Sequence, residues 1–280
     1  AAVAVLGHAQ PDLAICDGST LAIAPNDANT TPGVHTWSPS SVIATGGNFT
    51  DVAIGDVSGD GNADIVATDS TANSAVAYTA LTLTSAMPSI AVGTAPVAIA
   101  VGDLDGDGRA DLAVAGSSGT LLLRTPALTT TVVDATPAVS VAIGRFDIDG
   151  KLDVAYATAT GSSAVVHDAS GAIAPSNIEA LPSPTAATSV TAGSIDPTGQ
   201  FAGPAADTDE LVVGRSLGDL CIVRFRARAE STTIAGTGCG GSTPLISLFG
   251  GLPVLGNAAF GSNLDAATAN PFAVLAYQGH

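Results

Sequence analysis

The sequence repeats itself with a period of about 45 residues. Three copies align closely, at residues 51–65, 98–112 and 140–154. Weaker copies lie at residues 2–15, 190–213 and 245–277. In each close copy, an Asp- and Gly-rich loop separates two short apolar runs. A repeat of this length is one supersecondary unit that buries its faces only against its neighbours, so the chain is predicted to be an array of stacked units.

Each repeat is predicted to contain four short strands. In the best copy, the runs rich in Val, Ile, Leu and Thr are 97–101, 112–115, 121–124 and 129–133. Clusters of Gly, Pro, Asp and Ser bound these runs, and no segment keeps a helical apolar period long enough for a substantial helix. Four-stranded units that repeat every ~40–60 residues are typical of a β-propeller. We therefore predict an all-β fold, a propeller of four-stranded antiparallel blades.

The 280 residues are expected to form a single propeller domain, because all-β domains of this size fold as one unit. The repeats divide it into five complete blades and a partial sixth, at approximately residues 1–46, 47–92, 93–137, 138–186, 187–243 and 244–280. The ring is therefore not expected to close on these residues alone.

The charge of the chain excludes some classes of partner. Eight Lys and Arg stand against 25 Asp and Glu, which gives a net charge of −17. A surface of this sign repels phosphate backbones and anionic lipid heads, so we expect no nucleic-acid binding. We also expect no membrane insertion, because no stretch holds the roughly 20 consecutive apolar residues of a spanning helix. The acid is mostly Asp, with 22 Asp and 3 Glu, and Asp is typical of turns and oxygen-rich loops.

The segment Gly102–Ala115, preceded by Gly93-Thr-Ala-Pro96, resembles the FG-GAP (VCBS-type) repeat. The resemblance is strong over residues 47–160, weaker over 187–225 and architectural elsewhere. That repeat builds integrin-α-like propellers and many bacterial surface proteins. The resemblance implies a ring of six or seven blades when complete, and an extracellular or cell-surface location.

One acidic loop carries a full set of carboxylates. Asp103, Asp105, Asp107 and Asp111 occupy positions 1, 3, 5 and 9 of a nine-residue loop. Alternate carboxylates on a tightly turning backbone converge on one point, where they repel one another unless a cation is bound. Ca²⁺ suits such a loop, because it accepts about 6–8 oxygen ligands in flexible geometry. The carbonyl oxygen of Arg109 at position 7 is the expected fifth protein ligand.

Two further loops repeat this spacing with fewer charges. The second loop offers five groups, namely Asp56, Ser58, Asp60, Asn62 and Asp64. We expect it to bind Ca²⁺ more weakly than the first, because a hydroxyl stands at position 3. The third loop keeps Asp147, Asp149, Lys151 at position 7, and Asp153. Its position 1 is Arg145, so either Ca²⁺ or the Arg145 guanidinium balances these carboxylates, and the sequence leaves both open. In the weaker copy at 190–213, an insertion before Glu210 disfavours a metal.

The sequence offers little that indicates catalysis. Residues 214–218 match a nucleophile-elbow pattern, but a second strand follows rather than a helix, so we interpret the segment as a hairpin turn. The four histidines show no paired metal-ligand spacing. Cys221 and Cys239 are expected to form a disulfide if the protein is secreted.

These observations predict a non-catalytic binding or adhesion module, secreted or on the cell surface and stabilised by Ca²⁺. Two calcium ions are expected, in loops 56–64 and 103–111, and a third site is open at 147–153. A protein or a glycan would bind the propeller face or its connecting loops. Two alternatives remain open at this point: a structural subunit of a surface assembly or filament, and a carbohydrate-binding or lyase propeller.

Overall fold

The computed structural model describes residues 2–3, 12–27, 36–37, 41–79, 82–147, 149–167, 177–181, 186–193, 209–216, 218, 220–224, 246–248 and 262–264. The strands pair in antiparallel sheets, and these residues contain no α-helix. The predicted all-β fold is confirmed. Within the described part of the chain, no helix is long and apolar enough to cross a membrane.

The first sheet has seven strands in the order β1-β2-β3-β6-β7-β8-β9. Their bounds are Ala2–Val3, Asp12–Cys16, Gly18–Ala24, Ser41–Gly55, Asp64–Asp69, Ser74–Thr79 and Ser85–Ala91. This sheet is two four-stranded units that share β6. The start of β6 pairs with β3, and the part from Phe49 to Gly55 pairs with β7. We call β1, β2, β3 and the start of β6 the first unit, and the rest of the sheet the second unit.

The prediction of short strands is wrong for β6, which runs through the expected boundary at residue 46. Gly46 has φ +85°, a conformation that glycine adopts without steric cost. The neighbouring Gly47 has no room for a side chain, because a Cβ there would lie 2.6 Å from a carboxylate oxygen of Asp69. The two glycines lie between Thr45, which pairs with β3, and Phe49, where the pairing with β7 begins.

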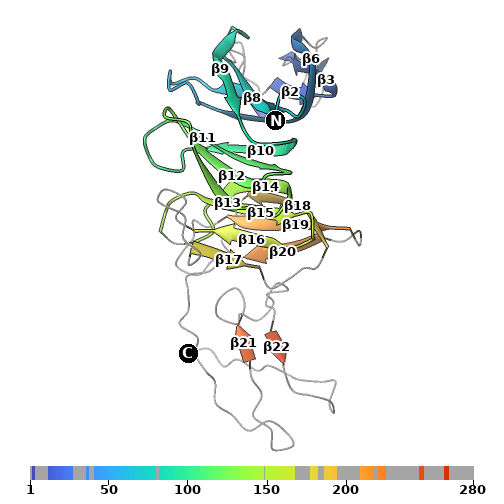
Figure 1. Ribbon diagram of the computed structural model, residues 1–280, viewed down its shortest axis with the longest axis vertical. Coiled ribbons are helices and arrows are strands. Elements are labelled where there is room, and N and C mark those ends of the chain that lie inside the picture. Colours follow the sequence, from blue (N-terminus) through green and yellow to red (C-terminus); the bar gives the residue numbers. More distant parts are fainter. Residues whose placement is uncertain are drawn as a thin grey trace, which may run out of the picture.

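The next three sheets each correspond to one unit (Figure 1). The third unit is β10 to β13, at Pro96–Gly102, Asp111–Gly116, Gly119–Arg124 and Thr129–Asp134. The fourth unit is β14 to β17, at Ala138–Gly144, Asp153–Thr158, Ser163–Val166 and Ile178–Ala180. The fifth unit has three described strands, β18 to β20, at Ala187–Gly193, Glu210–Arg215 and Leu220–Arg224. Two small sheets pair β4 (Asn26–Asp27) with β5 (Thr36–Trp37) and β21 (Ile246–Leu248) with β22 (Ser262–Leu264).

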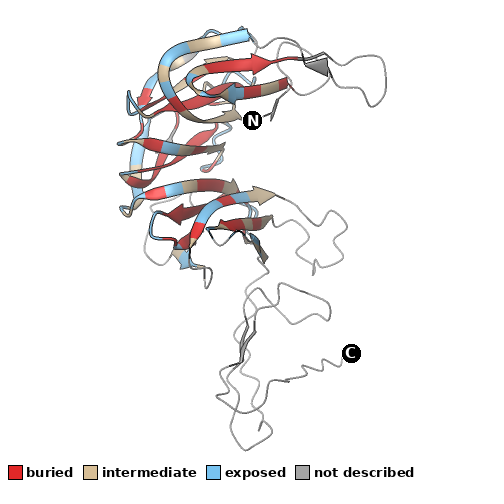
Figure 2. Cartoon of the chain, turned by 90° about the vertical axis from the view of Figure 1, so that its right-hand side faces the viewer, coloured by how far each residue is buried: buried red, intermediate tan, exposed pale blue. Residues whose placement is uncertain are grey.

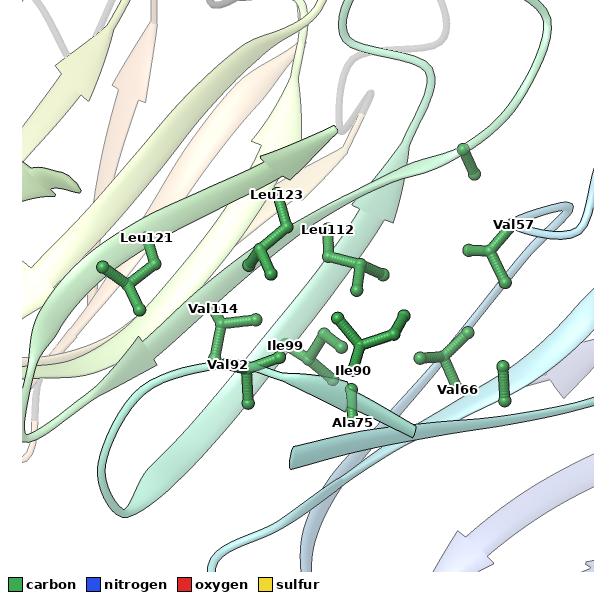
Figure 3. Packing of buried hydrophobic residues seen from close by; sticks show 12 residues of the cluster. Val57, Val66, Ala75, Ile90, Val92, Ile99, Leu112, Val114, Leu121 and Leu123 are labelled. Carbon is green, nitrogen blue, oxygen red and sulfur yellow. The ribbon is translucent and has the colours of Figure 1, made fainter. Parts of the chain in front are cut away.

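The core lies between successive units. Every residue of β7, β11 and β15 is buried, because each of these middle strands has neighbours on both faces of its sheet (Figure 2). Their sequences are accordingly near-continuous apolar runs rather than alternating ones. Figure 3 shows the cluster between the second and third units, which includes Val57, Val66, Ala75, Ile90, Ile99, Leu112, Val114 and Leu123. Similar clusters join the third unit to the fourth and the fourth to the fifth.

The first strands of the units, β6, β10, β14 and β18, contact one another in chain order. From the third unit on, each is the edge strand of its sheet, so its outward backbone groups need partners from the next unit. Asp51 on β6 accepts the N–H of Ile99 at 2.9 Å. The hydroxyl of Ser140 on β14 accepts the N–H of Val190 at 3.0 Å and donates to the carbonyl of Val190 at 3.3 Å. These side chains hold successive units together.

The predicted Cys221–Cys239 disulfide cannot be followed in the described residues, because it involves Cys239. Cys221 is a free thiol in the structure, and Cys239 lies outside the described residues. Cys16 is also a free thiol and half-buried. The blade boundaries and the number of blades in the whole ring stay predictions.

Candidate metal centres

The loop 103–111 connects β10 to β11 and is folded around the first carboxylate. Asp103 Oδ1 accepts the backbone N–H groups of Gly106 at 2.7 Å and Asp107 at 3.1 Å. Its other oxygen accepts the N–H of Gly108 at 3.0 Å. Asp105 in turn accepts the N–H of Asp107 at 3.2 Å. Asp side chains in tight turns accept backbone N–H groups in this way, and the resulting turn of the backbone brings alternate side chains together.

Three carboxylates of this loop converge. One oxygen each of Asp103, Asp105 and Asp111 lies within 4.8 Å of the other two. Asp111 is wholly buried at the start of β11, where it accepts the N–H groups of Leu104 at 3.0 Å and Thr125 at 2.8 Å. Burial and the negative charge of Asp105 raise the pKa of Asp111 to about 6. An all-oxygen set of this kind is the chemistry that Ca²⁺ takes.

Asp107, the fourth predicted carboxylate, does not belong to this group of three. It accepts the backbone N–H of Arg109 at 2.8 Å. The side chain of Arg109 reaches the loop of the preceding unit, where Nη1 donates to the carbonyl oxygen of Ser58 at 2.5 Å. A Cβ on Gly59 would overlap this guanidinium, so the close approach needs glycine there. The sequence predicted a role for the Arg109 carbonyl oxygen but not this hydrogen bond from its side chain to the loop of the preceding unit.

The loop 56–64, between β6 and β7, is built in the same way. Asp56 accepts three backbone N–H groups, from Gly59 at 2.6 Å, Asp60 at 3.1 Å and Gly61 at 2.8 Å. Asp60 accepts the backbone N–H of Asn62 at 2.8 Å and its side-chain amide at 3.2 Å. The repeated turn therefore forms with Ser58 in place of the second carboxylate.

The last carboxylate of this loop lacks a full set of partners. Asp64 is wholly buried, and its Oδ2 accepts the N–H groups of Val57 at 3.1 Å and Ser58 at 2.9 Å. Its Oδ1 is buried without a hydrogen-bond partner, and burial raises the pKa of the carboxyl group. Within the described chain, Asp56, Asp60 and Asp64 do not converge as closely as the carboxylates of loop 103–111. The calcium site predicted for loop 56–64 therefore stays a prediction.

The third loop brings in a residue that neither open alternative named, His167. The Arg145 side chain is exposed, and its backbone N–H donates to Asp209 at 2.9 Å. His167, which follows β16, lies against the carboxylates instead: Nδ1 is 3.4 Å from Asp147 Oδ2 and 3.7 Å from Asp153 Oδ2. Arg145 therefore does not take the place beside these carboxylates that one alternative gave it. The register of β15 with β16 brings the residue after Val166 beside Asp153 instead.

The pKa of His167 is shifted strongly by the acidic groups around it. Its Nε2 lies 3.0 Å from Glu179 Oε2. Hydrogen bonding to Asp153 and Glu179 raises the pKa of His167 to about 10, although burial opposes the shift. Burial also raises the pKa of Asp147. Asp149 accepts the N–H of Lys151 at 2.8 Å, as the corresponding carboxylates do in the other loops.

Two other segments singled out in the sequence can be placed. Residues 214–216 end β19 and begin a hairpin to β20, in which Gly214 pairs with Leu220. The interpretation of this elbow-like pattern as a hairpin turn is confirmed. The inserted loop of the fifth unit, residues 194–208, lies outside the described residues.

Comparison with protein families gives one match. The model described as "FG-GAP-like repeat" matches residues 56–114, from the start of the second-unit loop to β11. Residues 56–114 are thus similar to an FG-GAP-like repeat, as the sequence predicted. The match contains both the 56–64 and the 103–111 loops, so two of the three predicted calcium loops lie within it. A comparison with curated proteins finds no match.

Comparison with solved structures shows the fold. The chain is similar to BBS1N in complex with ARL6DN, in a mercury-soaked crystal, with 18% identity and a TM-score of 0.52 over 85% of this chain and 71% of that chain. For the lead-soaked crystal, the identity is 19% and the TM-score 0.53 over 89% and 76%. A weaker likeness is to the V. cholerae biofilm matrix protein Bap1, with 16% identity and a TM-score of 0.41 over 78% and 35%. The chain has the β-propeller fold, and its described units form an open arc (Figure 2).

Proposed function

We propose that this FG-GAP-like propeller is a calcium-stabilised, non-catalytic binding module that works outside the cell. The observation that carries the proposal is the convergence of Asp103, Asp105 and Asp111 in a loop that the repeat reproduces. A wholly buried carboxylate beside two others is unfavourable while all three are ionised. A bound Ca²⁺ would turn this repulsion into attraction and fix the connection between the first two strands of the unit.

Calcium would act on the structure rather than on a substrate. Loop 103–111 provides carboxylates and a backbone carbonyl to enclose the ion, so few positions are left to polarise another molecule. An ion that binds only the folded chain, present at 100 times its dissociation constant, stabilises the fold by about 2.7 kcal/mol. Extracellular calcium modules bind at about 10⁻⁴–10⁻³ M, a range that is filled only outside the cell.

The binding role is supported by the fold and by the charge. BBS1N, which shares the fold, is in complex with ARL6DN in the compared structures, so a propeller of this kind can serve as a protein-binding surface. The net charge of −17 favours a partner with a basic surface. We propose a protein partner in the first place, with a glycan as the alternative to be tested beside it.

The calcium part of the proposal is tested by removing one ligand from each of two loops. Calorimetric titration with CaCl₂ should give weaker binding for Asp105→Ala than for the parent, and EDTA should lower the melting temperature of the parent more than that of Asp105→Ala. Both Asp105 and the matched control Asp149 are exposed, so neither substitution disturbs the core. Asp149→Ala should leave calcium binding unchanged. Equal binding by the parent and Asp105→Ala would contradict the proposal.

The binding part is tested with the immobilised chain and two panels of probes. The first panel contains basic and acidic extracellular proteins, and the second contains sulfated and neutral glycans. We expect saturable binding to basic proteins that EDTA weakens, because calcium would stabilise the fold that presents the binding surface. Turnover of a glycan without retention would contradict a non-catalytic role, and binding to none of the probes would contradict the proposed partner class.

A further inference from the structure

The fourth unit gathers a nitrogen ligand and two carboxylates at one point. One ligand atom each of Asp147, Asp153 and His167 lies within 4.8 Å of the other two. His167 Nδ1 is 3.4 Å from Asp147 Oδ2 and 3.7 Å from Asp153 Oδ2. Asp153 is wholly buried, and only 17% of the His167 side chain is exposed. The three groups therefore face one another in a largely enclosed site.

The position of His167 distinguishes this unit from the others. In the second unit, the residue opposite the last carboxylate of the loop, Asp64, is Thr79. In the fifth unit, Arg224 is opposite Glu210. Of the second, fourth and fifth units, the fourth alone has at this position a residue that binds metal ions readily through nitrogen, His167. The hydroxyl of a Thr has no nitrogen, and the guanidinium of an Arg stays protonated.

We propose that Asp147, Asp153 and His167 form a site for a divalent transition metal of the Zn²⁺ class, in place of the calcium site of the preceding units. Two carboxylate oxygens and one imidazole nitrogen are a common protein ligand set for Zn²⁺ and Co²⁺. Three protein ligands leave a fourth position for water. The ligand set is unsuited to Ca²⁺, which takes oxygen ligands.

The two distances from His167 fit tetrahedral coordination. Zn²⁺ binds nitrogen and oxygen at about 2.0–2.1 Å, so two ligand atoms on a coordination tetrahedron lie about 3.3 Å apart. The separation of His167 Nδ1 from Asp147 Oδ2 is already 3.4 Å, and that from Asp153 Oδ2 is 3.7 Å. Shifts of a few tenths of an ångström would complete the geometry, well within the reach of side-chain rotation.

The second ring nitrogen has the partner that a metal-bound imidazole needs. His167 Nε2 lies 3.0 Å from Glu179 Oε2 on β17. A hydrogen bond from Nε2–H to a carboxylate leaves Nδ1, the atom that faces the two Asp side chains, as the nitrogen for a metal ion, which would displace the proton held there in the metal-free site. Asp153 is oriented in the same way, because its Oδ2 accepts the backbone N–H of Phe146 at 2.8 Å. Glu179 is thus a positioning residue for the metal ligand.

The proposal is tested by titrating the full chain with ZnCl₂ in the presence of excess CaCl₂, which occupies the oxygen-only loops. Calorimetry should detect a site in the parent that His167→Gln loses. Glu179→Gln should weaken Zn²⁺ binding by about 10–100-fold, the usual effect of removing a carboxylate that orients a ligating His. Co²⁺ bound to the parent should give the intense visible absorption of a four-coordinate site, and the spectrum should be absent from His167→Gln.

The control is Asp105→Ala, which removes a predicted calcium ligand from the third unit and leaves the fourth unit unchanged. It should bind Zn²⁺ like the parent, so a failure of the calcium proposal and a failure of this one give different results. Circular dichroism of each variant in EDTA establishes that it is folded. Equal Zn²⁺ affinity in the parent and both fourth-unit variants would overturn the proposal, as would displacement of Zn²⁺ by CaCl₂.

Discussion

The hydrogen bonds of Ser140 to Val190 offer a direct measure of how strongly successive units are joined. Ser140→Ala removes the acceptor of the Val190 N–H and the donor to the Val190 carbonyl. Val190 is buried, with 6% of its surface exposed, so its N–H is left without a partner in a place that water reaches poorly. An unsatisfied buried donor costs about 1–3 kcal/mol.

We expect Ser140→Ala to lower the free energy of unfolding by about 1–2 kcal/mol, because one of the two bonds is long and contributes little. In a chain of this size, each kcal/mol shifts the melting temperature by about 2–4 °C, so the expected fall is about 2–8 °C. Urea denaturation should show a lower midpoint with an unchanged slope, since the surface exposed on unfolding stays the same.

The matched control is Ser189→Ala. Ser189 occupies on β18 the position that Ser140 occupies on β14, as the pairing of each with its second strand shows. It is exposed, so its substitution should change the stability by less than about 0.5 kcal/mol. If Ser140→Ala and Ser189→Ala had the same midpoint, the hydrogen bonds between units would contribute no net stability and the reasoning would be wrong.

Two further predictions concern a turn and a buried carboxyl group. Gly119→Ala should destabilise the chain by about 2–4 kcal/mol in thermal denaturation, because Gly119 has φ +96° and a Cβ there would overlap the carbonyl oxygen of Asp134. The control is Gly61→Ala, at φ +84° with open space around it, which should cost about 1 kcal/mol. Equal losses of stability in the two variants would refute the steric argument. In EDTA, the stability contribution of Asp111 should fall as the pH rises from about 4 to about 6, because its raised pKa lets the folded chain hold a proton that the unfolded chain releases. Urea denaturation across this range should show a smaller fall for Asp111→Asn than for the parent, and an identical pH dependence would contradict the assignment.

The fold could be predicted because the sequence patterns that specify it are local. Apolar runs such as 112–115, bounded by Gly and Asp, occur at a constant period, and β11 has nearly the same bounds. The calcium-type loops were visible for the same reason, since the residues that turn the backbone around Asp103 lie within five positions of it.

The features that escaped prediction depend on register and on contacts between units. His167 is far along the chain from Asp147, and only the pairing of β15 with β16 brings the two together. The reach of the Arg109 side chain to Ser58 depends on how two units stack. The paired glycines at 46 and 47 resemble a strand end in the sequence, and only the sheet pairings on either side show that β6 continues through them.

Because the first and second units share strand β6, they cannot be separated without cutting that strand. Later units are joined by short connections, such as residues 92–95 and 135–137, where a protease can cut or a gene fusion can begin without breaking a sheet. Between the first and second units there is no such connection, because a cut after residue 46 would divide a strand that is hydrogen-bonded on both sides. The first two repeats should therefore be excised or transplanted as a pair, whereas the third and fourth units each begin after a connection that lies outside the sheets.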